Sequence, residues 1–307
     1  MITAIAALLA GGALLYFGGN WLVDGAVDLA QRLGISSVLV AIVVVGFGTS
    51  LPELIVSVTA VTDDADAIAM GNVVGSNIAN LLFVLAASAL ILPITIPRIC
   101  LRLDGLAMGL SAALLAALCV DGALTWLDGL ILCGALLAFV FVRTILDRAG
   151  DEVTLEGGMP GLATAGAICG GLLALPLGAH LFVFGGVELA RALGVSEAVI
   201  GLSVVALGTS LPEFATCIAA AVKRQSGVIV GNILGSNVFN STLVIGGAAL
   251  AETISVDPIF TRSVLWIMIF ATALSLFFMW TGARLNRAEG LVMLALYIGG
   301  VAGLAWL

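Results

Sequence analysis

The sequence has few charged residues: they make up 10% of its 307 positions, whereas 62% of the positions are hydrophobic. Soluble globular domains contain roughly 25% charged and 45–50% apolar residues. A water-soluble core of this length cannot bury such an excess of apolar side chains, so many of them must face lipid. The mean hydropathy of +1.24 agrees with this, and the composition indicates an integral membrane protein rather than a soluble domain.

Residues for several kinds of chemistry are also scarce. His180 is the single histidine, and the sequence contains no HExxH motif and no recognisable nucleophile–base pair, so we do not expect an enzyme. The five cysteines lie in apolar runs without the spacing of metal ligands, which is typical of small packing residues. No basic patch or nucleic-acid motif is present. We therefore expect the lipid bilayer as a partner, but no nucleic acid and no resident cofactor, and no feature specifies an oligomeric state.

Long apolar runs occur along the whole chain. Because about 20 helical residues span about 30 Å of hydrocarbon, these runs predict an all-α polytopic membrane protein. Ten transmembrane helices are expected, at about 2–27, 36–62, 67–92, 103–121, 124–145, 161–190, 196–222, 226–251, 260–281 and 288–306. Residues 146–160 have the composition of a soluble linker, and we expect them to join a first half, 1–145, to a second half, 161–307.

The distribution of lysine and arginine predicts the orientation, because cytoplasmic loops of membrane proteins carry an excess of both. With the N-terminus outside, nine of the 11 basic residues, Arg143 among them, fall in cytoplasmic loops, and Arg191 and Arg262 fall outside. The expected external loop 62–66 contains three acids and no base. We therefore expect a multi-pass protein of the cell membrane with both termini external and the 146–160 linker in the cytoplasm.

Two motifs occur twice in the sequence, 160 positions apart. GTSLPE at 48–53 recurs at 208–213, and GNVVGSNIAN at 71–80 aligns without a gap with GNILGSNVFN at 231–240. Either copy alone is a weak signal. Because both motifs recur at the same distance from each other, they indicate an internal repeat.

The two copies define repeats that cover about 36–92 and 196–251, one in each half. Because each half is predicted to contain five helices, an odd number, the two halves must enter the membrane with opposite orientations. Inverted repeats are typical of secondary transporters, which bind their substrates near the midplane between the repeats. A cation channel, in which the same oxygens form a filter, is a remote alternative that inverted repeats with broken helices argue against.

Each repeat places one carboxylate inside an apolar span, Glu53 in the first and Glu213 in the second. A charged side chain in the membrane interior costs several kcal/mol unless it is paired or lines a wet cavity. The alternative is a protonated glutamate bonded to a neighbouring helix. The two sites match, however, and no Lys or Arg is expected within a span to pair with them. We therefore predict that both glutamates bind a cation.

Pro52 and Pro212 directly precede the glutamates and are expected to kink their helices, because proline has no N–H for the carbonyl four residues earlier. Those carbonyls belong to Gly48 and Gly208 and are expected to be free to bind a cation. Hydroxyl groups lie on the same turns, at Thr49, Ser50, Thr209 and Ser210. Carbonyl, hydroxyl and carboxylate oxygens together form the kind of site that Ca²⁺ and Na⁺ prefer.

The second motif adds polar side chains at helical spacing. Side chains four residues apart share a helix face, and the pairs are Ser76 with Asn80 and Ser236 with Asn240. Interhelical hydrogen bonding is the favoured role for the first asparagine of each motif, Asn72 and Asn232.

With these motifs the sequence resembles the cation/Ca²⁺ exchanger superfamily and, within it, the prokaryotic sodium/calcium exchangers. The resemblance covers essentially the whole chain and rests on two copies of GTSLPE, each followed at a fixed distance by GN-x-x-GSN. In that family four core helices hold several cation sites, and the two glutamates take part in most of them. The resemblance implies the metal ligands Thr49, Ser50, Glu53, Ser76, Asn80, Thr209, Ser210, Glu213, Ser236 and Asn240, with the carbonyl of Ala206 as a further candidate.

Two departures from the family pattern bear on the coupling ion. Proton-coupled relatives usually carry an acid soon after the GN pair, whereas the stretches here read VVGSN and ILGSN, which favours Na⁺ coupling. Some sodium-coupled relatives, including potassium-dependent ones, have Asp at the position of Asn240, so the amide argues against potassium co-transport. We expect a Na⁺/Ca²⁺ antiporter that works by alternating access, with both ions as substrates. A H⁺/Ca²⁺ antiporter on the same scaffold is the alternative.

Overall fold

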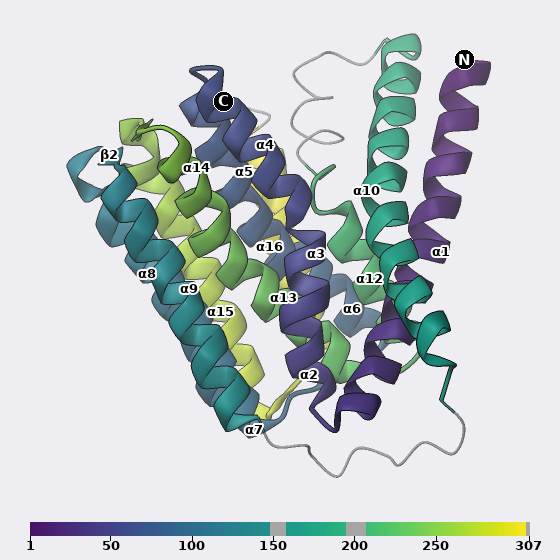
Figure 1. The fold of residues 1–307 in the computed structure, drawn as a ribbon. Helices are drawn as coiled ribbons and strands as arrows, with labels where there is room; N and C mark the ends of the chain where they lie inside the picture. The colour runs from purple at the N-terminus through teal and green to yellow at the C-terminus, as the bar shows by residue number, and fades with distance from the viewer. Residues whose placement is uncertain (148–157, 195–206, 305–307) are drawn as a thin grey trace.

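The protein is a bundle of long helices in a computed structural model, which describes residues 1–147, 158–194 and 207–304 (Figure 1). The first half begins with α1 (Ile2–Leu33) and ends with α9 (Trp126–Leu146). Between them lie three spans made of shorter pieces. The second span contains α2 (Ser37–Val40), η1 (Ala41–Gly46), α3 (Phe47–Thr49) and α4 (Leu51–Thr62). The third contains α5 (Asp66–Ala79), η2 (Asn80–Leu85) and α6 (Ala86–Ile91), and the fourth contains α7 (Arg98–Cys100), η3 (Leu101–Gly105), α8 (Leu106–Leu118) and η4 (Cys119–Asp121).

The second half repeats this pattern in the residues that the structure describes. It contains α10 (Gly161–Ala192), α12 (Leu211–Val222), α13 (Ser226–Phe239), η6 (Asn240–Val244), α14 (Ile245–Ala251), η7 (Phe260–Val264), α15 (Leu265–Gly282) and α16 (Arg287–Leu304). The η4 segment is a 3₁₀ turn, and η1, η2, η3, η6 and η7 are π-helical. The beginning of α1 and the end of α16 lie at the same end of the bundle (Figure 1).

Eight of the described helical segments are long and apolar enough to cross a membrane. Two of the ten expected spans are outside this set. The span expected at 196–222 is described only as the shorter apolar helix α12, and the span expected at 288–306 corresponds to α16. The membrane-spanning class of the fold is therefore confirmed, whereas the number ten stays a prediction. The fourth span begins at Arg98 rather than near 103, because Pro97 occupies the N-cap.

Arg143 differs from the sequence expectation. It was predicted in a cytoplasmic loop, but it lies in the last turn of α9 and is 3% exposed. Its guanidinium donates to the carboxylate of Asp104 at 2.8 Å and to that of Asp147 at 2.6 Å. Two carboxylates are thus paired with one guanidinium, and the buried ion pairs connect η3 with the end of α9.

The helices α1 and α10 pack closely along one flank of the bundle (Figure 1). Glycines at seven-residue spacing face the partner helix, at Gly11, Gly18 and Gly25 in α1 and at Gly171, Gly178 and Gly185 in α10. A Cβ atom at Gly178 would lie 2.9 Å from the backbone nitrogen of Leu15, and one at Gly11 would lie 2.6 Å from that of Phe182. Small residues allow such close backbone approach between membrane helices.

The centre of the bundle is formed by the segments that carry the repeated motifs. In the most apolar 18-residue stretch of 226–251, 94% of the residues are buried, whereas 28% are buried in the matching stretches of α1 and α10. Gly231 permits this central position, because a Cβ atom there would lie 2.5 Å from the carbonyl oxygen of Val38. The polar motifs are therefore shielded by the surrounding helices, which present their apolar surface outwards.

Four short strands were not expected from the sequence. β1 (Ile94–Thr95) pairs with β4 (Arg284–Leu285), and β2 (Ala123–Leu124) pairs with β3 (Ile254–Ser255), both antiparallel. Each pair joins a loop of the first half to a loop of the second. The two pairs lie at opposite ends of the helices, since β2 follows α8 and β1 precedes it.

Candidate cation site

The two glutamates lie where a span is interrupted and a new helix starts. Between α3 and α4 the helix is interrupted at Ser50, which has φ −86° and ψ 0°, and Ser210 has nearly the same angles before α12. Pro52 and Pro212 lie in the first turns of α4 and α12, and so do Glu53 and Glu213. The predicted kinks are thus full helix starts. The unpaired N–H groups and positive dipole end of a helix start stabilise a carboxylate there.

One of the two carbonyls that were expected to lack a hydrogen-bond partner has one. The carbonyl of Gly208 accepts a hydrogen bond of 3.4 Å from the N–H of Leu211, so the prediction that it lacks a partner is wrong. The turn tightens after Gly208, and an N–H three residues later replaces the one that proline lacks. The bond is longer than the usual 2.7–3.2 Å, and a carbonyl oxygen has a second lone pair.

Burial and missing partners mark the site most clearly. Glu53 and Glu213 are 0% exposed, and none of their four carboxylate oxygens has a hydrogen-bond partner. Polar atoms of four other predicted ligands are also buried and unpartnered, at Ser50, Asn80, Ser210 and Asn240. Buried polar groups are nearly always satisfied in native proteins. A cluster of unsatisfied oxygens around two carboxylates therefore fits a site that a cation completes.

The hydroxyl groups of the site are paired across the two halves. The Oγ1 atom of Thr49 lies 3.3 Å from Oγ of Ser236, and Oγ of Ser76 lies 3.3 Å from Oγ1 of Thr209. Thr209 is 160 positions after Thr49, and Ser236 is 160 positions after Ser76. In each contact a threonine of one half therefore meets a serine of the other half, and the two contacts are equivalent under the repeat.

The carboxylates lie beside these hydroxyl pairs. Glu53 lies next to Ser76 and within electrostatic range of Glu213, and Glu213 lies next to Thr49 and Ser236. No hydroxyl completes a hydrogen bond with either carboxylate. Within 1–147, 158–194 and 207–304, no group of three or more His, Cys, Asp or Glu side chains could hold a metal ion. A cation between the glutamates therefore needs neutral oxygens for the rest of its coordination.

Asn72 and Asn232 fix the glutamate helices rather than facing the site freely. The amide nitrogen of Asn72 donates to the backbone carbonyl of Glu53 at 3.0 Å and to Oγ of Ser57 at 2.9 Å. The amide nitrogen of Asn232 approaches the backbone carbonyl of Glu213 at 3.5 Å and Sγ of Cys217 at 3.2 Å, while its Oδ1 atom accepts from the site hydroxyls of Thr49 and Ser236 at 3.3 and 3.4 Å. The favoured interhelical role of both asparagines is confirmed.

Asn80 and Asn240 lie at matching irregularities of the helix. The π-helical segment η2 begins at Asn80, and η6 begins at Asn240. A π-turn widens the helix by one residue and is frequent at functional sites. Both amides are 0% exposed and lack hydrogen-bond partners for nitrogen and oxygen alike. Sequence periodicity gave no signal for these wider turns, although it did identify the two asparagines.

The structure describes ten of the eleven predicted ligand positions. Nine of them are buried: Thr49, Ser50, Glu53, Ser76, Asn80, Ser210, Glu213, Ser236 and Asn240. Thr209 is half-buried and meets Ser76. The predicted carbonyl ligand at Ala206 lies outside the described residues. His180 lies on an exposed part of α10.

Comparison with known proteins identifies relatives that cover the whole chain. The family model described as sodium/calcium exchanger protein matches residues 3–145 and 163–306. An uncharacterized membrane protein of Methanocaldococcus jannaschii is 32% identical over 308 residues, which are 99% of each chain. The inner membrane protein YrbG of Escherichia coli is also 32% identical and covers 100% of this chain and 98% of its own length. The sodium/calcium exchanger MaX1 of Methanosarcina acetivorans is 29% identical over 95% of both chains.

Solved structures of one exchanger share the fold. The sodium-calcium exchanger NCX_Mj, soaked with neither Na⁺ nor Ca²⁺, superimposes with a TM-score of 0.87 at 30% identity, and 98% of each chain is covered. Crystals of the same protein soaked with Na⁺ and Sr²⁺ give a TM-score of 0.86, again at 30% identity and 98% coverage.

Proposed function

We propose, from the premise that this chain belongs to the sodium/calcium exchanger protein family, that it is an antiporter that exchanges Na⁺ for Ca²⁺ by alternating access. Members of this family are ion exchangers and not enzymes, so Ca²⁺ and Na⁺ are substrates rather than cofactors. The single observation that carries the site is the pair of fully buried glutamates, Glu53 and Glu213, whose carboxylate oxygens lack any partner.

The two carboxylates are proposed to match the double charge of one Ca²⁺. Neutral oxygens complete its shell, as hard cations with six to eight oxygen ligands require. The proposed ligands are Thr49, Ser50, Glu53, Ser76, Asn80, Thr209, Ser210, Glu213, Ser236 and Asn240, together with the carbonyl of Ala206. Na⁺ ions distributed over the same oxygens replace Ca²⁺ in the other half of the cycle.

Alternating access follows from the cost of the empty site. Two buried carboxylates without a cation are expensive to keep out of water, so the protein changes sides readily when it is loaded and poorly when it is empty. The reciprocal contacts Thr49–Ser236 and Ser76–Thr209 support two halves related by inversion, with the site at the midplane between them. The flanking pair α1 and α10 is the candidate for the moving element.

The proposed topology has ten spans in two inverted halves. Residues 1–145 and 161–307 form the halves, and 146–160 link them on the cytoplasmic side, with both termini outside. The beginning of α1 and the end of α16 lie at one end of the bundle, which supports an even number of spans (Figure 1).

The function is tested by uptake of radioactive Ca²⁺ into proteoliposomes loaded with Na⁺ or with K⁺, with and without a pH gradient. We expect uptake driven by outward Na⁺ alone, and we expect Glu53→Gln and Glu213→Gln each to reduce it to the level of protein-free liposomes. Glu252→Gln is the matched control, because Glu252 is exposed after the end of α14.

Other outcomes of the same experiment contradict the proposal in different ways. Uptake driven by the pH gradient and indifferent to Na⁺ would make the protein a H⁺/Ca²⁺ antiporter that uses the same site. Uptake far faster than transporter turnover, with no requirement for Na⁺ or a pH gradient, would indicate a channel. Normal uptake by both glutamine variants would mean that the site lies elsewhere.

A further inference from the structure

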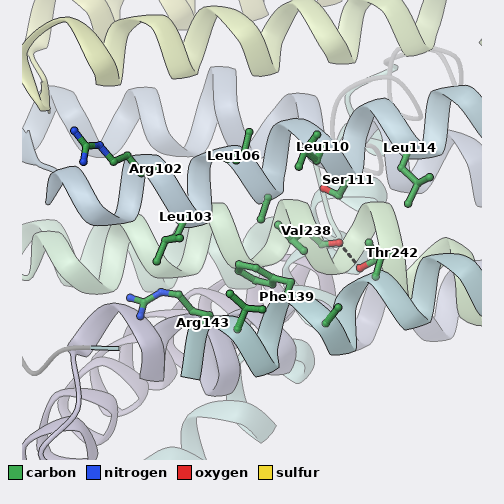
Figure 2. A pocket seen from close by; sticks show the side chains of 14 residues that line it. Arg102, Leu103, Leu106, Leu110, Ser111, Leu114, Phe139, Arg143, Val238 and Thr242 are labelled. Carbon is green, nitrogen blue, oxygen red and sulfur yellow. Dashed lines mark hydrogen bonds between the residues drawn. The ribbon is translucent and has the colours of Figure 1, made fainter. Parts of the chain in front are cut away.

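A groove runs between α8 and α9 (Figure 2), which lie on the side of the bundle opposite α1 and α10 (Figure 1). Its volume is about 410 Å³, and its lining includes Leu103, Leu106, Leu110, Ala135, Ala138 and Phe139. α8 and α9 belong to segments apolar enough to cross a membrane. Leu106 is 58% exposed and Leu110 is 60% exposed, so the groove is open to the side, where the hydrocarbon of the bilayer lies.

The groove offers hydrocarbon contacts rather than polar ones. Two hydroxyl groups lie in it, and both bond to carbonyls of their own helices: Ser111 to Met108 at 3.0 Å and Thr242 to Val238 at 2.5 Å. Figure 2 shows the bond of Thr242 at the end of the groove far from Arg102. Because these polar atoms are satisfied, the groove suits an alkyl chain better than a polar ligand.

One end of the groove carries two arginine side chains. Arg102 and Arg143 both lie there (Figure 2). Arg143 is paired with the carboxylates of Asp104 and Asp147. Arg102 is exposed and has no ion-pair or hydrogen-bond partner within the described part of the chain. The free positive charge at the mouth of the groove is therefore that of Arg102.

A second cavity lies beside the same arginine. It has a volume of about 200 Å³ and is lined by Arg98, Leu101, Arg102, Trp280 and Ala283. Arg98 is four residues before Arg102, so the two share a helix face, and Arg98 likewise has no partner among described residues. Trp280 is 60% exposed, as is typical of aromatic residues at the membrane–water interface.

We propose that the groove and this arginine cavity together bind one anionic phospholipid, with its phosphate at Arg98 and Arg102 and an acyl chain along the groove. Arginine forks bind phosphate oxygens in a bidentate manner, and basic pockets between membrane helices bind anionic headgroups. The apolar lining of the groove matches the other end of the same molecule. The far wall of the groove includes Val238 and Thr242, on the helix that carries Ser236 and Asn240 of the cation site.

The experiment is native mass spectrometry of the full chain in detergent, titrated with palmitoyl-oleoyl phosphatidylglycerol or with the phosphatidylcholine of the same chains. We expect one phosphatidylglycerol to be retained in preference to phosphatidylcholine. Because each arginine near an anionic headgroup contributes roughly fivefold in affinity, Arg98→Gln together with Arg102→Gln is expected to weaken phosphatidylglycerol binding roughly 30-fold. Arg262→Gln is the charge-matched control, since it lies 160 positions after Arg102 in η7, which follows β3 at the opposite end of the bundle.

A second variant tests the groove itself. Ala138 is exposed on the groove wall, so Ala138→Phe fills the groove without disturbing buried packing, and we expect it to abolish the retained lipid. Leu137→Phe is its control, because Leu137 is 71% exposed on the same helix and does not line the groove. Equal retention of both lipids by the wild type would overturn the proposal. The proposal would also be overturned if the arginine double variant or Ala138→Phe retained phosphatidylglycerol as well as the wild type does.

Discussion

At the scale of single residues, the proposed site contains hydroxyl groups of the two halves that contact each other. Thr49 is 1% exposed and meets Ser236, while Ser76 meets Thr209. Each pair places a hydroxyl oxygen next to a carboxylate that lacks a hydrogen-bond partner. The two halves are thus expected to contribute equally to cation binding.

Thr49→Val and Thr209→Val test this equality. Valine has the shape of threonine but no oxygen, so each variant removes one proposed ligand and leaves the packing volume nearly unchanged. We expect each variant to lose about 1 kcal/mol of Ca²⁺-binding free energy, which corresponds to about a fivefold higher Ca²⁺ concentration for half-maximal uptake.

Thr62→Val is the control for these variants, because its exposed hydroxyl donates to a carbonyl of its own helix. A large effect of Thr49→Val combined with none of Thr209→Val would contradict the equal contribution of the halves.

The sequence allowed polar residues to be proposed as cation ligands but did not predict which side chains they contact. Glu53, Ser76 and Asn80 could be selected because polar side chains in apolar spans are costly and because a second copy exists. The contact of Thr49 with Ser236 depends on how the two halves pack, which no local spacing encodes. Arg143 was misplaced for a similar reason, since its burial depends on the carboxylate of Asp104, 39 residues earlier.

At the scale of helices, the interrupted spans and the glycine contacts have different origins in the sequence. Proline next to glutamate was a local signal, and the structure turns the expected kink into the start of α4 and of α12. The approach of α1 to α10 was not predicted, although their glycines recur every seven residues. Their pairing became evident only from the folded arrangement, and the two-residue strands were too short to leave any pattern.

Gly178→Ala tests the packing of α1 against α10. The new Cβ atom would lie 2.9 Å from the backbone nitrogen of Leu15 and 3.0 Å from the carbonyl oxygen of Gly11. Backbone atoms cannot move aside as a side chain can, so the helices must separate. We expect a destabilisation of about 1–3 kcal/mol, measured as a lower midpoint of thermal unfolding in detergent.

Gly166→Ala provides the control in the same helix, because no described atom lies within 4 Å of a Cβ atom there. Alanine favours a helix over glycine, so this variant is expected to be neutral or slightly stabilising. Equal midpoints for the two variants would show that the glycine contact with α1 does not limit stability.

At the scale of the whole molecule, a buried ionic network joins segments that are distant in the chain. Arg143 in α9 contacts Asp104 in η3 and Asp147, and Asp147 accepts hydrogen bonds from the N–H and hydroxyl of Ser36, which caps α2. Burial raises the pKa of the Asp147 carboxyl, but the hydrogen bonds from Ser36 and Arg143 outweigh it and hold the pKa below its usual value.

Arg143→Met is expected to destabilise the protein by about 3–5 kcal/mol, because it leaves the Asp104 carboxylate, which is 0% exposed, without its partner. Thermal unfolding at pH 7 is the measurement. Asp147 contributes fully to folding stability at this pH, because a carboxyl whose pKa is lowered by folding stabilises the protein at any pH above its unfolded-state pKa of about 3.9. This contribution is lost as the pH falls through the lower pKa of the folded state.

Two comparisons make the result of Arg143→Met specific. Arg284→Met removes an exposed arginine and should leave the midpoint unchanged. Adding Asp104→Asn to Arg143→Met removes the stranded charge and should restore part of the loss. A double variant less stable than Arg143→Met alone would contradict the ionic explanation.

The reciprocal hydroxyl contacts also have an evolutionary consequence. A single ancestral half, inserted into the membrane in both directions, would have made Thr49–Ser236 and Ser76–Thr209 as one and the same contact in a homodimer. After fusion of two such copies into one gene, each position would have been free to diverge from its twin. Ser57 beside Asn72 and Cys217 beside Asn232 differ in this way at aligned positions, and both accept an amide hydrogen of the asparagine that binds a glutamate helix.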